Sequence, residues 1–166
     1  MSYVCVIRLN MHNQRLKHHN YNMKTTEKPT LQEFHIDGVK HINPQDTFDC
    51  LKNNEAVLID VRECEEVDIE SIPMDNVLYH PMSTIMDHLT SISKEQNIIL
   101  MCPGGVRSTK VANLLNIQGY PNVANLDGGF KLWKSLGLPF ESIMPSGNGC
   151  SGGCSSCSPD AKSSCC

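Results

Sequence analysis

The sequence has no long apolar run, and this absence limits the classes of protein to which it can belong. None of its apolar stretches approaches the about 18 residues that a membrane-spanning helix needs. The first residues, MSYVCVIRLNMHNQRLKHHNYNMK, also lack the small-residue cleavage site of a secretory signal. We therefore expect a cytoplasmic protein with no membrane partner.

Basic charge is scarce in the main part of the chain. Residues 31–149 carry eight Lys or Arg against sixteen Asp or Glu, whereas residues 1–30 carry five basic residues and one acidic residue. Binding to a phosphate backbone requires a basic face. The acidic body of the chain therefore argues against nucleic acid as the main partner.

The nine cysteines do not follow the pattern of a secreted domain held together by disulfides. Their number is odd, four of them are scattered over the first 149 residues, and five crowd the last 17. Small secreted domains instead carry even numbers of cysteines distributed through the fold. The distribution indicates a reducing compartment.

The chain divides into three parts by composition. Residues 1–34 read as an N-terminal extension that we expect to be disordered, with Met11 and Met23 as alternative starts. Residues 35–144 form one domain in which apolar, β-branched runs alternate with helical patterns. Residues 145–166 are rich in Cys, Gly and Ser and read as a flexible tail with little to bury.

The alternation within residues 35–144 predicts an α/β fold with a mainly parallel central sheet flanked by helices. The apolar runs predict strands within residues 56–61, 75–81, 96–102 and 122–129. The helical patterns fall within residues 42–54, 62–72, 82–93, 107–120 and 130–138. In such sheets, ligands bind outside the carboxyl ends of the strands.

Several residues mark the expected helix ends. Asn43 is a candidate N-cap with Pro44 at the first helical position, and Ser83 is a candidate cap for the helix within residues 82–93. Gly119 and Gly137 are expected to end the two later helices. Phe130 and Trp133 are expected to anchor the core; none of these positions carries chemistry of its own.

The stretch CPGGVRS, residues 102–108, combines a thiol with the parts of an anion site. Cys102 follows a buried strand, and a helix is expected to begin near Arg107. Gly104 and Gly105 allow backbone turns that let successive N–H groups converge on the sulfur. Arg107 adds a permanent charge with a planar fork. We therefore expect this thiol to ionise more readily than an ordinary cysteine.

The chain resembles the rhodanese family in three separate pieces over roughly residues 41–141. CPGGVRS is similar to the family's active loop, with four residues between cysteine and arginine. The segment from Leu58 to Pro73, LIDVRECEEVDIESIP, resembles its Asp-Val-Arg and Ile-Pro signatures. LDGGFKLWKSLGLP, from Leu126 to Pro139, resembles its late Gly-Gly, Trp and Gly-x-Pro pattern.

The resemblance implies a sulfurtransferase that needs no cofactor. Cys102 takes a sulfane sulfur from a small donor, thiosulfate or a persulfide, and passes it to a thiol or protein acceptor, with Arg107 beside it. The surrounding anion-binding loop, in which Pro103 has no N–H to offer, consists of Pro103, Gly104, Gly105, Val106 and Ser108. Related phosphatases have a loop one residue longer, so the count here favours sulfur over phosphate.

Two features depart from the family pattern, and one pair is open to two readings. Pro103 stands where the family often has a basic residue, and residues 70–73 read Glu-Ser-Ile-Pro in place of Gly-His-Ile-Pro. Asp60 and Arg62 are expected to support the loop as a structural pair, with direct substrate contact by Arg62 as the alternative.

The remaining cysteines support a second hypothesis. Cys150, Cys154 and Cys157 have a spacing found among iron–sulfur ligands, and three thiolates on a flexible segment could hold a soft metal such as Cu(I) or zinc, or receive sulfur from Cys102. The protein would then be a sulfur- or metal-carrying module in which the tail acts; the alternative is a disordered tail with no ligand. Cys64 is either a resolving thiol or an incidental helix residue.

Overall fold

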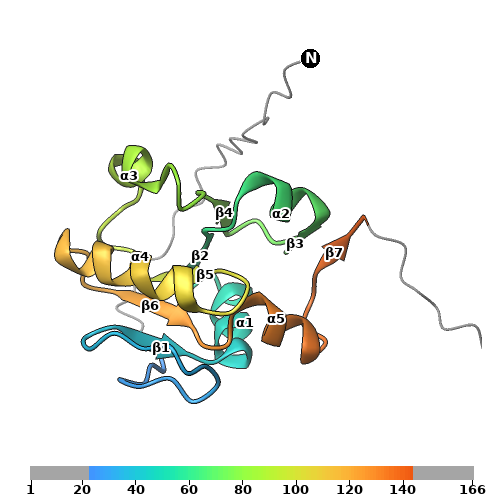
Figure 1. Cartoon of the computed structure of the whole chain (residues 1–166), viewed down its shortest axis with the longest axis horizontal. Coiled ribbons are helices and arrows are strands. Elements are labelled where there is room, and N and C mark those ends of the chain that lie inside the picture. Colours follow the sequence, from blue (N-terminus) through green and yellow to red (C-terminus); the bar gives the residue numbers. More distant parts are fainter. Residues whose placement is uncertain (1–22, 144–166) are drawn as a thin grey trace, which may run out of the picture.

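The computed structural model describes residues 23–143, which form a five-stranded parallel sheet with helices on both faces (Figure 1). The strands lie in the order β1-β6-β5-β2-β4, and every neighbouring pair is parallel. The α/β class and the parallel sheet expected from the sequence are confirmed. The bounds of the strands and helices are β1 Lys40–Ile42, α1 Pro44–Lys52, β2 Val57–Asp60, α2 Cys64–Ile69, β3 Glu70–Ser71, β4 Val77–Tyr79, α3 Ile85–His88, β5 Ile98–Met101, α4 Val106–Ile117, β6 Val123–Leu126, α5 Gly129–Ser135 and β7 Glu141–Ser142.

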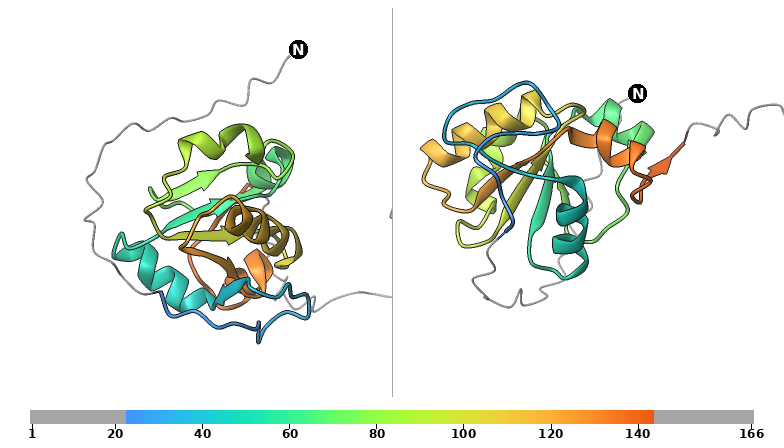
Figure 2. Two further views of the ribbon diagram at one scale, coloured as in Figure 1. Left: turned by 90° about the vertical axis from the view of Figure 1, so that its left-hand side faces the viewer. Right: turned by 90° about the horizontal axis from the view of Figure 1, so that it is seen from below.

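Two apolar layers sandwich the sheet because successive strand residues point to opposite faces. On one face, Ile99 and Met101 of β5 pack with α1 and α5 around Trp133. On the other face, Ile98 and Leu100 pack with α3 and α4. Cys102 continues this alternation, so its side chain lies on the α4 side of the sheet. Figure 2 shows the helices on both sides of the strands.

The carboxyl ends of the central strands meet at one edge of the sheet. Asp60 ends β2 and is in register with Met101, which ends β5. Asp127 follows β6 at the same edge, and its N–H donates to the carbonyl of Ile42 at the end of β1. Parallel strands bring these ends together, and Cys102 lies among them.

Residues 23–36, the N-terminal strap, pack against the domain. Met23 is buried in the core, Thr26 pairs antiparallel with His41, and the N–H groups of Thr30 and Leu31 donate to the Asp127 carboxylate. The sequence placed residues 23–34 in a disordered extension; they instead lie on the sheet edge because Met23 and the buried Asp127 carboxylate anchor them. Residues 1–22 and 144–166 lie outside the described part, so the expectations for them remain predictions.

The helix ends follow the sequence in part. Asn43 caps α1, accepting a hydrogen bond from the Asp46 N–H with Pro44 next to it, and Gly119 and Gly137 follow α4 and α5. The prediction that Ser83 caps the helix within residues 82–93 was wrong. In place of the expected longer helix, the structure has the four-residue helix α3 and then a 3-10 turn, Leu89–Ser91. Thr84, not Ser83, directly precedes α3, and the Ser83 hydroxyl donates to the Glu63 carboxylate instead.

A second, two-stranded sheet was not expected from the sequence. β3 directly follows α2 and pairs antiparallel with β7, and the N–H of Ile143 donates to the carbonyl of Ile69. Both strands have only two residues, too short for an alternation of apolar and polar side chains to reveal them. No helix between residues 23 and 143 has the length and apolar character that crossing a membrane requires.

Candidate functional site

Cys102 lies directly after β5 with its sulfur beneath the loop that leads to α4. Only 1% of its surface is exposed. The Gly105 N–H donates to Sγ at 3.2 Å, and the Ser108 hydroxyl oxygen lies 3.2 Å from the same sulfur. A buried sulfur with a backbone donor and a hydroxyl beside it can hold negative charge, because both groups can point hydrogens at it.

Gly105 is the member of the glycine pair whose backbone conformation requires glycine. Its φ is +89°, and a Cβ at this position would lie 1.7 Å from Oε1 of Gln32. Gly104 has open space where a Cβ would be, and its φ is not positive. From the sequence, we expected Gly104 and Gly105 to play the same part in the turn. The difference arises because Gly105 precedes α4 in the left-handed conformation.

The first residues of α5 are hydrogen-bonded to the loop that follows Cys102. The N–H groups of Phe130 and Lys131 donate to the carbonyls of Cys102 and Pro103 at 2.9 and 3.0 Å. A Cβ on Gly129 would meet the Cys102 carbonyl oxygen at 2.4 Å, so only glycine allows the two backbones to approach this closely. The Gly-Gly pair of the third sequence piece therefore serves the loop, although the sequence alone did not connect them.

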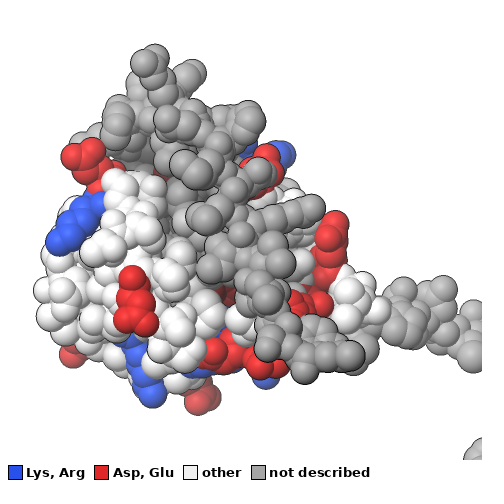
Figure 3. Space-filling model, turned by 90° about the horizontal axis from the view of Figure 1, so that it is seen from above, with Lys and Arg blue, Asp and Glu red and all other residues white. Residues whose placement is uncertain are grey.

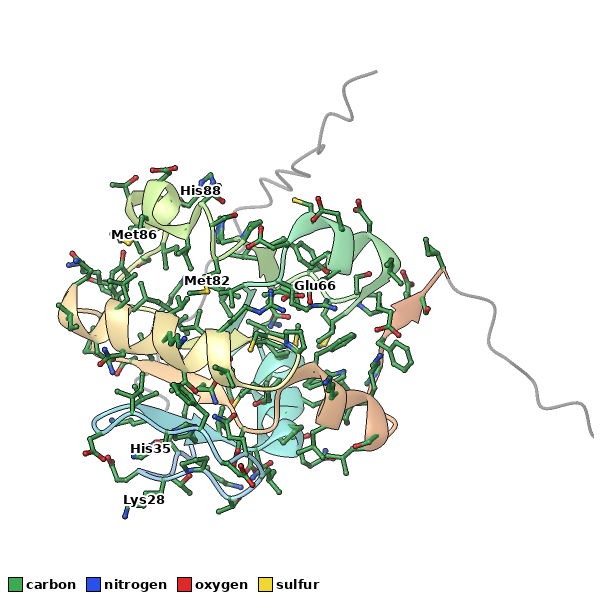
Figure 4. The ribbon with its side chains drawn as sticks, in the orientation of Figure 1. Lys28, His35, Glu66, Met82, Met86 and His88 are labelled. Atoms are coloured by element: carbon green, nitrogen blue, oxygen red, sulfur yellow. The ribbon has the colours of Figure 1, made fainter. Side chains whose placement is uncertain are left out.

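Arg107 forms a two-pronged ion pair with Glu66 of α2. The two terminal guanidinium nitrogens, Nη1 and Nη2, each donate to one carboxylate oxygen at 2.7 Å. This hydrogen bonding raises the pKa of Arg107 and lowers the pKa of Glu66. From the sequence we expected Arg107 to add its charge and planar fork beside the sulfur; in the structure the fork is paired with Glu66 and links α4 to α2. Figure 4 shows Glu66 between α2 and the loop.

Glu66 was not singled out from the sequence. The available signal was the run of acidic residues at 63, 65, 66 and 68, which read only as an acidic helix. Figure 3 shows acidic side chains more prominently than basic ones on the side of the molecule where α2 and α3 lie. One member of such a run cannot be chosen without knowing which side of the helix faces the loop.

Asp60 and Arg62 form an enclosed pair behind the loop. Arg62 Nε and Nη2 donate to Asp60 Oδ2 at 2.9 and 2.6 Å, and Nη2 also donates to the Glu70 carbonyl at 2.9 Å. The guanidinium carbon lies 4.2 Å from the centre of the Phe130 ring. With Nε, Nη2 and one face of the guanidinium in contact, and with only 3% of the side chain exposed, the geometry favours a supporting role for Arg62 over substrate contact.

A buried polar chain leads away from the sulfur, and the sequence did not reveal it. The Ser108 hydroxyl lies 2.6 Å from Asn125 Oδ1, and Asn125 Nδ2 lies 3.1 Å from His41 Nδ1 and 3.0 Å from Gln32 Oε1. Burial lowers the pKa of His41, although Asp127 opposes this effect. The only signal was Asn125 inside a predicted apolar strand, because the strand that carries His41, Lys40–Ile42, was not predicted from the sequence.

The other predicted site residues have the following places. Pro103 is half-buried, Val106 is exposed as the first residue of α4, and Cys64 begins α2 half-buried. Cys150, Cys154 and Cys157 lie outside the described residues. Between residues 23 and 143, His, Cys, Asp and Glu form no group of three that could hold a metal ion.

Comparison with known proteins gives one family. The family model described as "Rhodanese-like domain" matches residues 44–136. The chain is similar to the thiosulfate sulfurtransferase GlpE of Actinobacillus succinogenes, 31% identical over 104 residues that cover 60% of this chain and 88% of that protein. GlpE of Coxiella burnetii is 30% identical over 96 residues, covering 58% and 88%.

Solved structures agree with this match. The rhodanese-like domain protein of Staphylococcus aureus is 34% identical, with a TM-score of 0.52, and the match covers 56% of this chain and 89% of that one. A rhodanese-related protein of Thermoplasma volcanium is 26% identical, with a TM-score of 0.55, and the match covers 61% and 96%. The residues matched by the family model, 44–136, contain Cys102 and the loop, whereas the N-terminal strap precedes them.

Proposed function

Because the chain belongs to the rhodanese-like domain family, we propose that it is a sulfurtransferase in which Cys102 carries a sulfane sulfur as a persulfide. The proposal depends on one observation, a buried sulfur that receives the Gly105 N–H and lies beside the Ser108 hydroxyl. The curated relatives named thiosulfate sulfurtransferase support it at about 30% identity.

The reaction has two half-reactions. The Cys102 thiolate attacks the sulfane sulfur of the donor, the donor's S–S bond breaks, and the leaving group departs with the electron pair, as sulfite if the donor is thiosulfate. An acceptor thiolate then attacks the outer sulfur of the persulfide, and the Cys102 thiolate is restored. The Gly105 N–H and the Ser108 hydroxyl hold the charge of both anions.

Arg107 contributes by holding the loop in place. Its guanidinium is fixed to Glu66, so it anchors the start of α4, from which Ser108 reaches the sulfur. The Phe130 and Lys131 N–H groups anchor the other end of the loop. Together these contacts keep the donors within reach of the sulfur, which is what catalysis by preorganised dipoles requires.

We expect persulfide donors to react faster than thiosulfate. Both arginines at the loop are paired with carboxylates, and residue 103 is a proline. Residue 103 therefore adds no positive charge to attract a dianion such as thiosulfate, and the acidic side chains near the loop repel it. A persulfide carries less negative charge, so this repulsion is weaker. Comparing the loading rates of the two donors at several salt concentrations tests this preference, because salt screens the repulsion of the dianion more.

The function is tested by loading the full chain with sulfur and measuring its intact mass. We expect the donor to add the mass of one sulfur atom at Cys102, and Cys102→Ser to remove that addition. Cys50→Ala is the matched control, because Cys50 is also buried but lies on α1, where burial raises its thiol pKa. Sulfur on Cys102→Ser, or none on the unaltered chain, contradicts the proposal. Hydrolysis of p-nitrophenyl phosphate would favour the phosphatase alternative.

The glycine pair tests the loop geometry. Gly105→Ala places a methyl group against Gln32 in a left-handed backbone, so we expect loading to slow by at least about tenfold and stability to fall by about 1–3 kcal/mol. Gly104→Ala is the control, since a Cβ there meets open space. Equal effects of the two substitutions on the loading rate would show that the loop conformation does not matter.

The carrier function remains the second candidate, and its support is the five cysteines in residues 150–166. In that case the tail would accept sulfur from Cys102 or hold a soft metal. Truncation after Pro145 separates the two functions: a pure catalyst keeps its turnover with an external thiol, whereas a carrier loses most of its delivered sulfur or bound metal. Intact mass and metal analysis of protein purified without reductant provide the measurement.

A further inference from the structure

Gln32 of the N-terminal strap contacts the polar chain that leads to the Cys102 sulfur, although it precedes the residues matched by the family model. Its Oε1 accepts from the Gly128 N–H at 3.2 Å and from Asn125 Nδ2 at 3.0 Å. Its Nε2 donates to the Phe34 carbonyl at 2.7 Å and to Thr109 Oγ1 at 3.2 Å. The side chain is half-buried and makes four hydrogen bonds.

These partners fix which way the Gln32 amide faces. The Phe34 carbonyl can only accept and the Gly128 N–H can only donate, so Nε2 must face the first and Oε1 the second. A reversed amide would bring two acceptors together at Phe34 and two donors together at Gly128. Gln32 therefore has one orientation in this site.

The orientation of Gln32 determines that of Asn125. Because Gln32 Oε1 is an acceptor, Asn125 must turn Nδ2 towards it and Oδ1 towards Ser108. The other Nδ2 hydrogen then donates to His41 Nδ1, so His41 carries its hydrogen on Nε2 and donates to His35 Nδ1, 3.2 Å away. Figure 4 labels His35, which lies in the N-terminal strap beside β1.

Ser108 is the last link before the sulfur. A hydroxyl has one hydrogen to donate, and Asn125 Oδ1 takes it at 2.6 Å. The Ser108 oxygen then presents a lone pair to Cys102 Sγ at 3.2 Å. This arrangement suits a protonated S–H donor, whereas a thiolate or persulfide anion needs the hydroxyl hydrogen for itself.

We propose that Gln32 is a positioning residue that keeps the Ser108 hydrogen turned away from the resting Cys102 thiol. It acts through Asn125 and keeps the sulfur less reactive while the thiol is protonated. When the reaction makes the sulfur negative, the Ser108 hydrogen can turn towards it. The inference uses the proposed function only in taking Cys102 as the reacting residue. It assigns a role in the site to the strap, which lies outside the matched domain.

Gln32→Leu tests the inference by alkylation. Without the fixed amide, Asn125 can turn its Nδ2 towards Ser108. The acceptors left for the hydroxyl hydrogen are then the Gly105 carbonyl and the Cys102 sulfur, both 3.2 Å away, and a charged thiolate is the stronger acceptor of the two. We expect iodoacetamide to modify Cys102 on the order of tenfold faster at pH 7, the effect of about one hydrogen bond to a charged group, with the whole rate–pH profile moved to lower pH. Peptide mass spectrometry reads Cys102 separately, with Cys64 as reference in the same sample.

A double-mutant cycle separates this role from general loosening of the loop. In a Ser108→Ala background, Gln32→Leu should no longer accelerate alkylation, because its effect passes through the Ser108 hydroxyl. Loosening would accelerate alkylation in both backgrounds alike. Thr30→Val is the control in the strap: it removes a hydroxyl contact to Asp127 and leaves the Gln32 contacts in place, so we expect no change.

Asn125→Ala provides a second route if Gln32→Leu does not fold. It frees the Ser108 hydroxyl directly and should give the same Ser108-dependent acceleration. An unchanged rate in a folded variant, or equal acceleration with and without Ser108, overturns the inference. If the unaltered chain takes up no sulfur but the Ser108-dependent acceleration is seen, the sulfurtransferase proposal fails and the role of Gln32 stands.

Discussion

Two arginine–carboxylate pairs flank the loop that follows Cys102, and they differ mainly in burial. The Arg62 and Asp60 side chains are 3% and 0% exposed, whereas those of Arg107 and Glu66 are 33% and 37% exposed. Both pairs involve a two-pronged guanidinium contact. The comparison shows that the same pair of charged groups can serve as a fixed part of the fold or as an adjustable support for the loop.

The two carboxylates respond to their surroundings in opposite directions. Burial raises the pKa of Asp60, even though Arg62 opposes this shift. The hydrogen bonds from Arg107 lower the pKa of Glu66, and burial opposes this shift less effectively at the surface. Charges taken out of water lose hydration that their partner restores only in part, whereas exposed charges keep most of theirs.

Arg62→Met should have the largest effect on stability. It removes the guanidinium from the buried Asp60 carboxylate and leaves the backbone N–H of residue 62 in place, so an unpaired charge remains buried. We expect the free energy of unfolding to fall by about 3–5 kcal/mol at pH 7. Arg107→Met is the matched substitution, and we expect it to cost at most about 1 kcal/mol because water replaces the lost contact. Urea unfolding of both variants provides the measurement.

A double variant sharpens this test. Replacing Asp60 with Leu together with Arg62→Met removes both charges and should recover part of the lost stability. A similar loss for Arg62→Met and Arg107→Met would break the comparison. It would show that burial does not distinguish the two pairs.

Glu66→Gln should affect the loop more than the fold. Gln lacks the charge that holds the Arg107 fork, so the start of α4 becomes less fixed and Ser108 is positioned less well at the sulfur. We expect Cys102 to take up sulfur on the order of tenfold more slowly, with little change in urea unfolding. A time course of intact mass measures the loading.

The control for Glu66→Gln is Glu65→Gln, which removes a charge from the same helix at an exposed position. It should leave the loading rate unchanged. If both substitutions slow loading equally, the effect comes from the total charge of α2 and not from the ion pair between Glu66 and Arg107.

Much of the fold could be predicted because its signals are local. The strands around residues 57–60 and 98–101 are continuous apolar runs, and Asn43 followed by Pro44 marks a helix start. The segment after Pro81 was predicted less well, because the apolar spacing at Ile85 and Leu89 does not show that the helix gives way to a 3-10 turn.

The site could be predicted only where its parts are neighbours in the chain. Cys102, Gly105 and Ser108 lie within seven residues, and the loop they form was expected. Glu66 and Gln32 reach the same loop from 41 and 73 residues away from Arg107 and Gly105. Their contacts depend on the order of strands in the sheet and on the path of the strap, which local patterns do not contain.

The smallest expected effect is the pH dependence of the exposed pair. The pKa of Glu66 is lower in the folded chain than its ordinary value of 4.5, so its pairing stabilises the fold above pH 4.5 and is lost as the pH falls through the folded pKa. We expect the unaltered chain to exceed Glu66→Gln in stability by a few tenths of a kcal/mol at pH 7, and the difference to vanish in acid. Urea unfolding at a series of pH values measures it, with Glu65→Gln as the reference for general charge. A difference that grows below pH 4.5 would contradict this pairing, because protonated Glu66 can no longer hold the Arg107 charge.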